Sequence, residues 1–199
     1  MIGIIHYNMG NITSVQNSLE FLGIPAMVLE NPEQMTEATH IILPGVGAFS
    51  EGIKNLKELG FAEAILKQVA DGKPFLGLCL GMQLLASRGT EGGAVVGLNL
   101  IPGEVLRLPS DKGVRVPHIG WNDIKIVRSN PIFTESADFY FVHSYYFVPK
   151  TSDDVLAVCD YGVEFPAAIG RDRVFGTQFH PEKSHQAGLN ILKNFAALT

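Results

Sequence analysis

A cysteine between two glycines joins a strand-like apolar run to a second apolar run that predicts the start of a helix. The segment Gly77-Leu78-Cys79-Leu80-Gly81 follows Phe75-Leu76 and precedes Met82-Gln83-Leu84-Leu85-Ala86. Glycine on both sides permits the close approach and unusual backbone angles of a sharp strand-to-helix turn. This is the pattern of a nucleophile elbow with sulfur as the reactive atom. It predicts that Cys79 lies at a helix N-terminus, where a thiolate is favoured.

A histidine and a glutamate far downstream have the spacing of a base and its orienting carboxylate. In Gln178-Phe179-His180-Pro181-Glu182 the two side chains are two residues apart, which places them on one face of an extended segment. Each motif alone has an ordinary explanation, a buried structural cysteine or a turn before a helix. Together they favour a cysteine-based acyl-transfer enzyme with Cys79, His180 and Glu182 as the catalytic residues.

Size and composition restrict the other possibilities. The 199 residues, 46% hydrophobic and 18% charged, predict one compact domain over residues 1–199. A net charge of −5 without a basic run disfavours nucleic acid and anionic membranes as partners. The two cysteines and the lack of a basic leader predict a cytoplasmic protein without a disulfide, in which Cys159 is an inert core thiol. Without metal-ligand spacing or nucleotide-binding motifs, we expect no metal and no cofactor.

Strand and helix patterns alternate along the first half of the chain. Strands are predicted at 2–7, 25–29, 41–43 and 75–78, and helices at 11–22, 53–59 and 61–69, with a last helix at 186–198. From about Gly89, short strands predict an antiparallel extension: 105–106, 124–127, 139–142, 155–158, 167–169 and 174–179. The predicted fold is therefore α/β, with a mixed, mostly parallel central sheet, helices on both faces and this extension.

The turn Pro44-Gly45-Val46-Gly47 follows one of the predicted buried strands. The carboxyl ends of parallel strands meet at one sheet edge, so we expect this turn to lie near Cys79. A turn flanked by glycines can present backbone N–H groups to the oxyanion that develops during acyl transfer.

Six segments carry a family resemblance. Leu43–Phe49, Gly77–Gln83 and Gln178–Ser184 together resemble the class I (triad) glutamine amidotransferases. Val116–Asn122 (V-P-H-I-G-W-N), Tyr140–Tyr145 and Gly97–Gly103 narrow the likeness to the glutaminase subunits of imidazole glycerol phosphate synthase, in histidine biosynthesis. The resemblance extends almost from end to end. It departs after the first strand, where His6-Tyr7-Asn8 stands in place of the family's usual Asp-Tyr-Gly.

The resemblance implies roles for individual residues. Cys79 would attack the side-chain amide of glutamine, His180 would act as general base and then general acid, and Glu182 would orient His180. The implied oxyanion and substrate-binding residues are Gly45, Val46, Gly47, Leu80, Gln83, Ser144 and Tyr145. The implied face toward the partner, where ammonia leaves, includes His118, Trp121, Asn122, Tyr140 and Lys183. That partner would be a synthase (cyclase) subunit, bound as a heterodimer with an ammonia channel.

Three classes of function stay open at this point. The preferred one is a glutaminase subunit that supplies ammonia to a synthase, in histidine biosynthesis or, given His6 and Asn8, in a paralogous pathway that amidates surface sugars. A freestanding cysteine hydrolase would not need the V-P-H-I-G-W-N segment. A non-catalytic interaction subunit would be expected to lack Cys79 or His180, and both are present.

Overall fold

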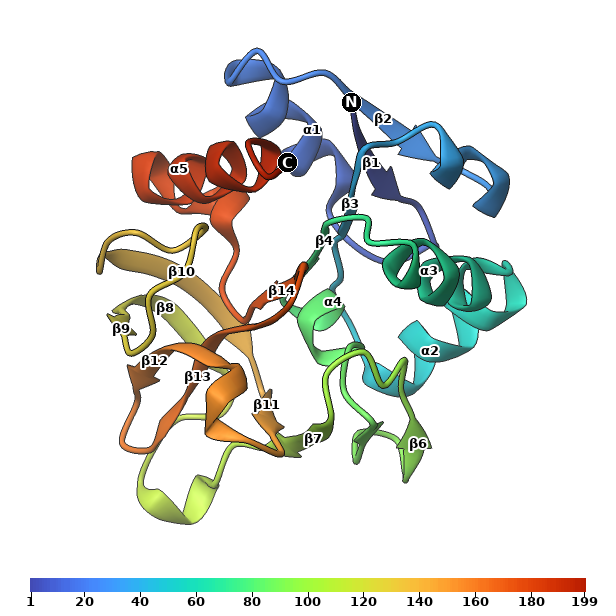
Figure 1. Cartoon of the computed structure of the whole chain (residues 1–199). Helices are drawn as coiled ribbons and strands as arrows, with labels where there is room; N and C mark the ends of the chain where they lie inside the picture. The colour runs from blue at the N-terminus through green and yellow to red at the C-terminus, as the bar shows by residue number, and fades with distance from the viewer.

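The computed structural model describes residues 1–199, apart from the side chain of Lys112 (Figure 1). The strands are β1 (Ile2–Ile5), β2 (Ala26–Leu29), β3 (His40–Leu43), β4 (Phe75–Leu78), β5 (Arg88–Gly89), β6 (Val95–Val96), β7 (Gly103–Arg107), β8 (His118–Asp123), β9 (Lys125–Ile126), β10 (Asp138–His143), β11 (Tyr145–Pro149), β12 (Val155–Asp160), β13 (Glu164–Arg171) and β14 (Val174–Thr177). The α-helices are α1 (Ile12–Phe21), α2 (Phe49–Glu58), α3 (Phe61–Ala70), α4 (Leu80–Gln83) and α5 (His185–Ala196). Short 3-10 turns are η1 (Pro32–Thr36), η2 (Ser110–Lys112), η3 (Ser152–Asp154) and η4 (Pro181–Lys183).

The main sheet has eight strands in the order β2-β1-β3-β4-β14-β13-β12-β9. It is parallel from β2 to β14 and antiparallel from β14 to β9. The predicted mixed sheet with an antiparallel extension is therefore confirmed. One strand was placed wrongly: β14, predicted within the extension, pairs in parallel with β4 at the centre of the sheet. An apolar pattern predicts that a segment forms a strand, but it does not predict which strands that segment pairs with.

Two hydrophobic cores lie on opposite faces of the main sheet. One packs α2 and α3 against the sheet through residues such as Ile53 and Ile65, and the other packs α1 and α5 through residues such as Val15 and Leu192 (Figure 1). Alternating strand residues divide between the two cores, because successive side chains of a strand point to opposite faces. This arrangement confirms helices on both faces and fixes the central strands that carry the site.

Two smaller sheets complete the second half of the chain. β10 pairs with β8, and β11-β7-β5-β6 form a four-stranded sheet. The sequence analysis missed β8 as a strand, since the repeated turn residues around it hide its pattern. β10 leads directly into β11, so Ser144, the single residue between these two strands, lies where the small sheets meet.

Helix boundaries follow local caps in one case and a distant contact in another. The Asn11 side chain accepts the Ser14 N–H at 3.3 Å and caps α1, which begins one residue after the predicted start at residue 11. α2 begins at Phe49, four residues before the predicted start at Ile53. Its first N–H donates at 2.9 Å to the carboxylate of Glu91, which is 42 residues away in the chain. A cap supplied from so far away leaves no local signal.

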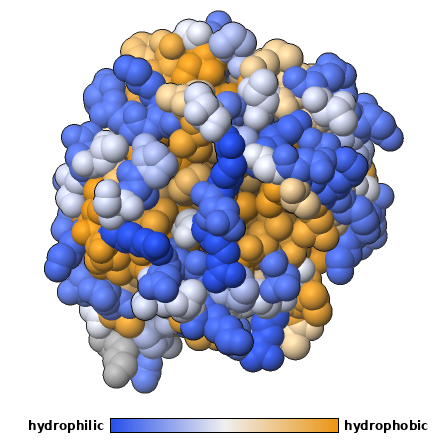
Figure 2. Space-filling model, viewed as in Figure 1, coloured by the Kyte–Doolittle hydropathy of each residue, from blue (hydrophilic) through white to orange (hydrophobic). Residues whose placement is uncertain are grey.

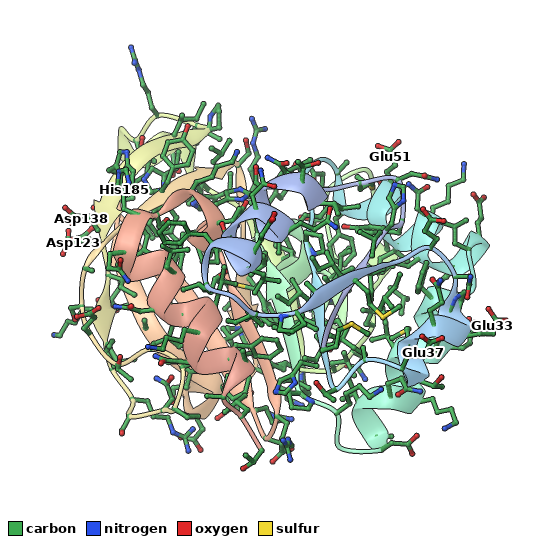
Figure 3. All side chains as sticks on the ribbon, turned by 90° about the horizontal axis from the view of Figure 1, so that it is seen from above. Glu33, Glu37, Glu51, Asp123, Asp138 and His185 are labelled. Carbon is green, nitrogen blue, oxygen red and sulfur yellow. The ribbon has the colours of Figure 1, made fainter. Side chains whose placement is uncertain are left out.

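The surface mixes polar and apolar side chains. Figure 2 shows hydrophobic residues in recesses between hydrophilic ones on the face viewed. Figure 3 shows Asp123 and Asp138 near His185, with Glu33 and Glu37 toward the opposite end. In the part of the chain that the structure describes, no helix combines the length and the apolar character needed to cross a membrane.

Candidate active site

The elbow at Cys79 has the strained backbone that a nucleophile turn requires. Cys79 has φ 53° and ψ −108°, a conformation that a residue with a Cβ rarely adopts. The residue caps α4, which is a single turn, and its side chain is 6% exposed. The sequence predicted a longer helix here. A single turn carries little dipole, so the electrostatic partner of the thiol has to come from side chains.

The glycines of the elbow serve close packing. A Cβ on Gly77 would lie 2.5 Å from Gly81 O, and a Cβ on Gly81 would collide with Leu43 O of the neighbouring strand. The positive φ that was expected at a glycine falls on Cys79 itself. Gly77 therefore lets the turn fold back on itself and Gly81 lets it pack tightly against β3, while the strained backbone falls on the nucleophile.

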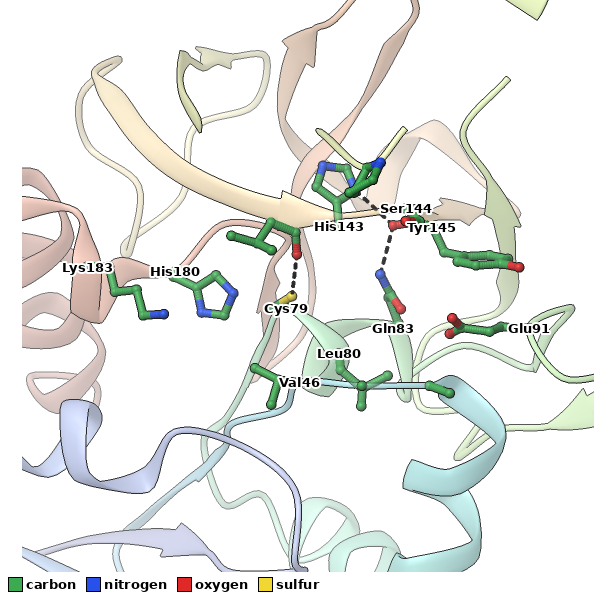
Figure 4. A pocket seen from close by; sticks show the side chains of 14 residues that line it. Val46, Cys79, Leu80, Gln83, Glu91, His143, Ser144, Tyr145, His180 and Lys183 are labelled. Carbon is green, nitrogen blue, oxygen red and sulfur yellow. Dashed lines mark hydrogen bonds between the residues drawn. The ribbon is translucent and has the colours of Figure 1, made fainter. Parts of the chain in front are cut away.

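His180 and Glu182 form a buried pair opposite the thiol. His180 Nδ1 and Glu182 Oε1 are 2.8 Å apart, and both side chains are buried. The His180 N–H donates to Tyr140 O at 2.9 Å, and the buried Ser184 hydroxyl donates to His180 O at 2.6 Å. These contacts fix η4 and hold the imidazole facing Cys79 (Figure 4).

The surroundings of His180 change its proton affinity. Burial alone would lower the pKa of His180, but interactions with Cys79 and Glu182 outweigh it and raise the pKa to about 10. The imidazole is thus suited to hold the proton that a nucleophile gives up and to pass it to a leaving group.

Backbone and amide groups also contact the sulfur. Cys79 Sγ donates to Val142 O at 3.7 Å, and Gln178 Nε2 donates to Cys79 Sγ at 3.8 Å. Gln83 Nε2 in turn donates to Tyr145 O at 2.8 Å (Figure 4). The same Nε2 donates to Gln178 Oε1 at 3.1 Å. Gln178 is fully buried. The sequence analysis quoted this residue beside His180 without giving it a role.

The turn after β3 lies beside the elbow. Its Gly45 carbonyl accepts a hydrogen bond from a backbone N–H that acyl transfer needs as an oxyanion donor. Leu80 N–H, the backbone donor that follows the nucleophile, donates to Gly45 O at 3.3 Å. The C=O of Gly45 and the N–H of Val46 belong to one peptide unit and point in opposite directions. Rotation of that peptide unit would free Leu80 N–H. It would also turn Val46 N–H toward the position now occupied by the Gly45 carbonyl, so that both N–H groups could donate to one oxyanion.

These groups surround a cavity of about 450 Å³, a size typical of small-molecule sites. It is lined by Val46, Gly47, Ala48, Cys79, Leu80, Gln83, Glu91, Pro117, Val142, His143, Ser144, Tyr145, His180 and Lys183. Cys79 lies between the His180 side and the Glu91 side of this cavity (Figure 4). The sequence analysis missed Glu91, although an acidic residue beside the two glycines of Thr90-Glu91-Gly92-Gly93 could have suggested a binding loop.

The residues predicted at the partner face divide into two groups. Trp121 is 47% exposed, stacks on His185 with ring centroids 4.8 Å apart and contacts Tyr140 at 5.9 Å. Lys183 Nζ lies 6.0 Å from the centre of the Tyr140 ring. These four residues form an aromatic surface, which we call the Trp121 surface. Asn122 lies beside it on β8, and its side chain donates to Asp160 O at 3.1 Å.

His118, which is also predicted at the partner face, does not belong to that surface. It is 2% exposed, stacks on Tyr161 and Phe141, and its Nδ1 lies 3.1 Å from Nε2 of the buried His143. His143 Nδ1 lies 2.9 Å from Tyr145 O. Alternation along β8 explains the difference, because His118 points inward whereas Trp121, three residues further on, points outward.

The profile of the family described as glutamine amidotransferase class-I matches residues 4–198. The chain belongs to this family. In this amidotransferase Cys79 and His180 line the same cavity, although they are far apart in the sequence, and Glu182 pairs with His180 behind the cavity wall.

Relatives of this amidotransferase are similar over their whole length. "Imidazole glycerol phosphate synthase subunit HisH" of Moorella thermoacetica is 50% identical over 200 residues, covering 99% of this chain and 94% of the relative. The subunit of the same name from Geobacter sulfurreducens is 49% identical, with 99% and 98% covered. "Imidazole glycerol phosphate synthase subunit HisH 1" of Campylobacter jejuni is 47% identical, with 100% of both chains covered.

Solved structures share the fold of this amidotransferase. The structure described as "Crystal structure of glutamine amidotransferase" has a TM-score of 0.78 at 21% identity and covers 99% of both chains. The structure of PurLQS from Thermotoga maritima has a TM-score of 0.78 at 20% identity, with 98% of this chain and 96% of that chain covered. At such low identity the likeness concerns the fold alone.

The buried histidine pair predicts a loss of stability in acid. Burial lowers the pKa of His118 to about 4 and that of His143 to about 3, whereas an unfolded chain binds these protons near the ordinary pKa of 6.5. Between pH 6.5 and about 4 the unfolded amidotransferase therefore binds more protons, so its free energy of unfolding falls as the pH is lowered. We expect a smaller fall for His118→Phe, measured by urea unfolding across this range.

A matched variant separates this effect from general acid sensitivity. His6 is exposed at the end of β1, so His6→Phe should keep the pH dependence of the original chain. Equal pH slopes for His118→Phe and the original chain would show that the buried pair does not control acid stability.

Proposed function

We propose that this chain is the glutaminase subunit of an imidazole glycerol phosphate synthase. It hydrolyses glutamine to glutamate and ammonia and passes the ammonia to a synthase subunit in histidine biosynthesis. The observation that carries the proposal is the strained Cys79 elbow facing the buried His180–Glu182 pair. Relatives 46–50% identical over almost the whole chain, which bear the name of that subunit, support the pathway.

Charge gives the direction in which glutamine enters the cavity. Glu91 contributes a carboxylate to the wall on the side away from His180. The α-ammonium group of glutamine is oriented toward Glu91, which leaves the side-chain amide next to Cys79. Gln83, Ser144 and Tyr145 line the space between these two ends.

Hydrolysis proceeds in two steps that share one base. Cys79 Sγ, whose proton His180 has taken up, forms a bond to the amide carbon, and the C–N bond then breaks as His180 protonates the departing ammonia. Water attacks the resulting thioester, gives its proton to His180 and releases glutamate together with the free cysteine. Glu182 keeps the imidazole in position and stabilises its charged form in both steps.

The oxyanion donors control the rate of glutamine hydrolysis. In the structure the Gly45 carbonyl holds Leu80 N–H, so this donor does not face the substrate. Rotation of the Gly45–Val46 peptide gives two donors, Leu80 N–H and Val46 N–H. We assign this rotation to the binding of the synthase partner, which uses the exposed Trp121 surface as its anchor, since aromatic residues dominate interface energetics.

Nitrogen transfer within a reconstituted complex tests the proposal. We expect the chain and the synthase subunit of the same organism to make imidazole glycerol phosphate with ¹⁵N from amide-labelled glutamine. The label should remain almost undiluted in the presence of excess unlabelled ammonium, because the ammonia passes between the subunits without reaching solvent. Mass spectrometry of the product measures the label.

Two results would contradict this assignment. Full dilution of the label would show that ammonia is released to solvent, as a freestanding hydrolase does. Transfer to an amidated sugar by a different synthase, with no transfer to imidazole glycerol phosphate, would assign the chain to the paralogous pathway. A cytoplasmic location belongs to the same proposal, supported by the need to keep the Cys79 thiol reduced, and cell fractionation tests it.

A further inference from the structure

Tyr7 carries a polar group that the fold leaves unpaired. The residue follows β1, its side chain is 0% exposed, and its backbone carbonyl accepts a hydrogen bond from Asn55 Nδ2 at 3.2 Å. Among the residues that the structure describes, Tyr7 Oη has no hydrogen-bond partner. A buried hydroxyl without a partner is destabilising relative to an apolar group of the same shape, so its presence calls for an explanation.

The hydroxyl lies beside the peptide that controls the oxyanion donors. A Cβ added to Gly45 would be 2.6 Å from Tyr7 Oη and 2.8 Å from Gly81 N, so Tyr7 and the elbow both lie close against Gly45. The carbonyl of Gly45 at present accepts the Leu80 N–H at 3.3 Å, a long hydrogen bond. The unpaired donor and the movable acceptor are thus neighbours.

Tyr7 stays protonated, and so stays a donor, during catalysis. Burial raises the pKa of Tyr7 well above its ordinary value, and the nearby Cys79 raises it further. The phenol therefore has an O–H to give at neutral pH, and the carbonyl of Gly45 can accept it.

We propose that Tyr7 is a positioning residue for glutamine hydrolysis, whose hydroxyl donates to the Gly45 carbonyl once that carbonyl has left Leu80 N–H. The hydrogen bond exists only after the Gly45–Val46 peptide has turned. It therefore favours the arrangement with two free oxyanion donors over the resting one, since a group that interacts in one state alone shifts the equilibrium toward that state. This inference rests on the proposed function.

Tyr7→Phe removes the hydroxyl and keeps the ring, so it tests the hydrogen bond alone. With the synthase partner and its substrate present, we expect kcat for glutamate formation to fall about tenfold, the value of one net hydrogen bond, while KM for glutamine changes less than twofold. The melting temperature of the isolated variant should stay the same or rise, because an unpaired buried hydroxyl is lost. A residue that only packs the core would leave kcat unchanged.

A transition-state analogue adds a second readout. An aldehyde derived from glutamine forms a tetrahedral adduct with Cys79 and places an oxyanion at the two donors, so its affinity should fall in Tyr7→Phe by the same factor as kcat. Tyr146→Phe is the matched control, because Tyr146 is a partly buried tyrosine on β11 outside the cavity. It should change neither kcat nor the affinity for the aldehyde.

The outcomes separate the two proposals. Partner-stimulated glutamate formation with equal kcat in the original chain and in Tyr7→Phe would overturn the role of Tyr7 and leave the proposed function standing. Equal losses in Tyr7→Phe and Tyr146→Phe would overturn the role as well. Absence of glutamate formation by the original chain in complex would instead overturn the proposed function.

Discussion

Cys79→Ala is expected to reduce glutamine hydrolysis by about 10⁴-fold or more, the scale seen when a covalent nucleophile is removed. The reason is that no thioester can form, and the remaining His180–Glu182 pair can only assist direct attack by water. The fold and the binding of the synthase partner should be retained, because alanine relieves rather than adds crowding at the elbow. Glutamate release, circular dichroism and partner binding by calorimetry check the three parts of this prediction.

The second cysteine provides the control. Cys159 is buried in β12, and burial together with Asp123 and Asp160 raises its pKa to about 12, so it stays an unreactive thiol. Cys159→Ala should keep full activity and lower the free energy of unfolding by about 1 kcal/mol. An electrophilic glutamine analogue should label Cys79 alone. Full turnover by Cys79→Ala, or a label found on Cys159, would refute the assignment of the nucleophile.

The isolated chain is expected to form glutamate about 10²–10³-fold more slowly than the complex with a synthase that carries its own substrate. The loss of even one oxyanion donor has this cost, and in the structure Leu80 N–H is held by Gly45 O while Val46 N–H points the opposite way. Partner binding stimulates hydrolysis only to the extent that it favours the turned peptide. The measurement is the rate of glutamate formation by the chain alone, with the partner, and with the partner and its substrate.

Substitutions on the surface test where the partner acts. Trp121→Ala should weaken association or stimulation while leaving the slow basal rate unchanged, because Trp121 is exposed and outside the cavity. Leu66→Ala is the control, since Leu66 is an exposed apolar residue on α3. Equal rates in all three conditions would disprove partner gating and favour a freestanding hydrolase.

The sequence could predict the fold because its signals are local. Apolar runs and caps such as Asn11 define strands and helices within a few residues, and their alternating order implies a mostly parallel sheet. Pairing is not local, which is why β14 was assigned to the extension although it lies beside β4. The early start of α2 was missed for the same reason, since its cap comes from Glu91.

The same difference between local and non-local signals applies to the candidate site. Cys79, His180 and Glu182 could be proposed from spacing and residue type, because each motif brings its own backbone geometry. The roles of Gln178 and of Tyr7 could not, since one depends on a side-chain contact across the pocket and the other on a hydroxyl left without a partner. The burial of His118 could not be predicted, because β8 was missed as a strand and tertiary packing decides which face of that strand is covered.

The short strand β10 has a further consequence for how such a subunit can change its partner over evolution. Its backbone serves the chemistry: Tyr140 O accepts the His180 N–H, and Val142 O accepts the thiol of Cys79. The side chains of the same two residues point away from the core, between the buried Phe139, Phe141 and His143. Mutations at position 140, which does not line the cavity, can therefore redesign the outer surface for a new synthase while the carbonyls that hold the nucleophile and the base stay unchanged. The side chains of β10 that contact a partner can therefore change independently of the backbone carbonyls that serve catalysis.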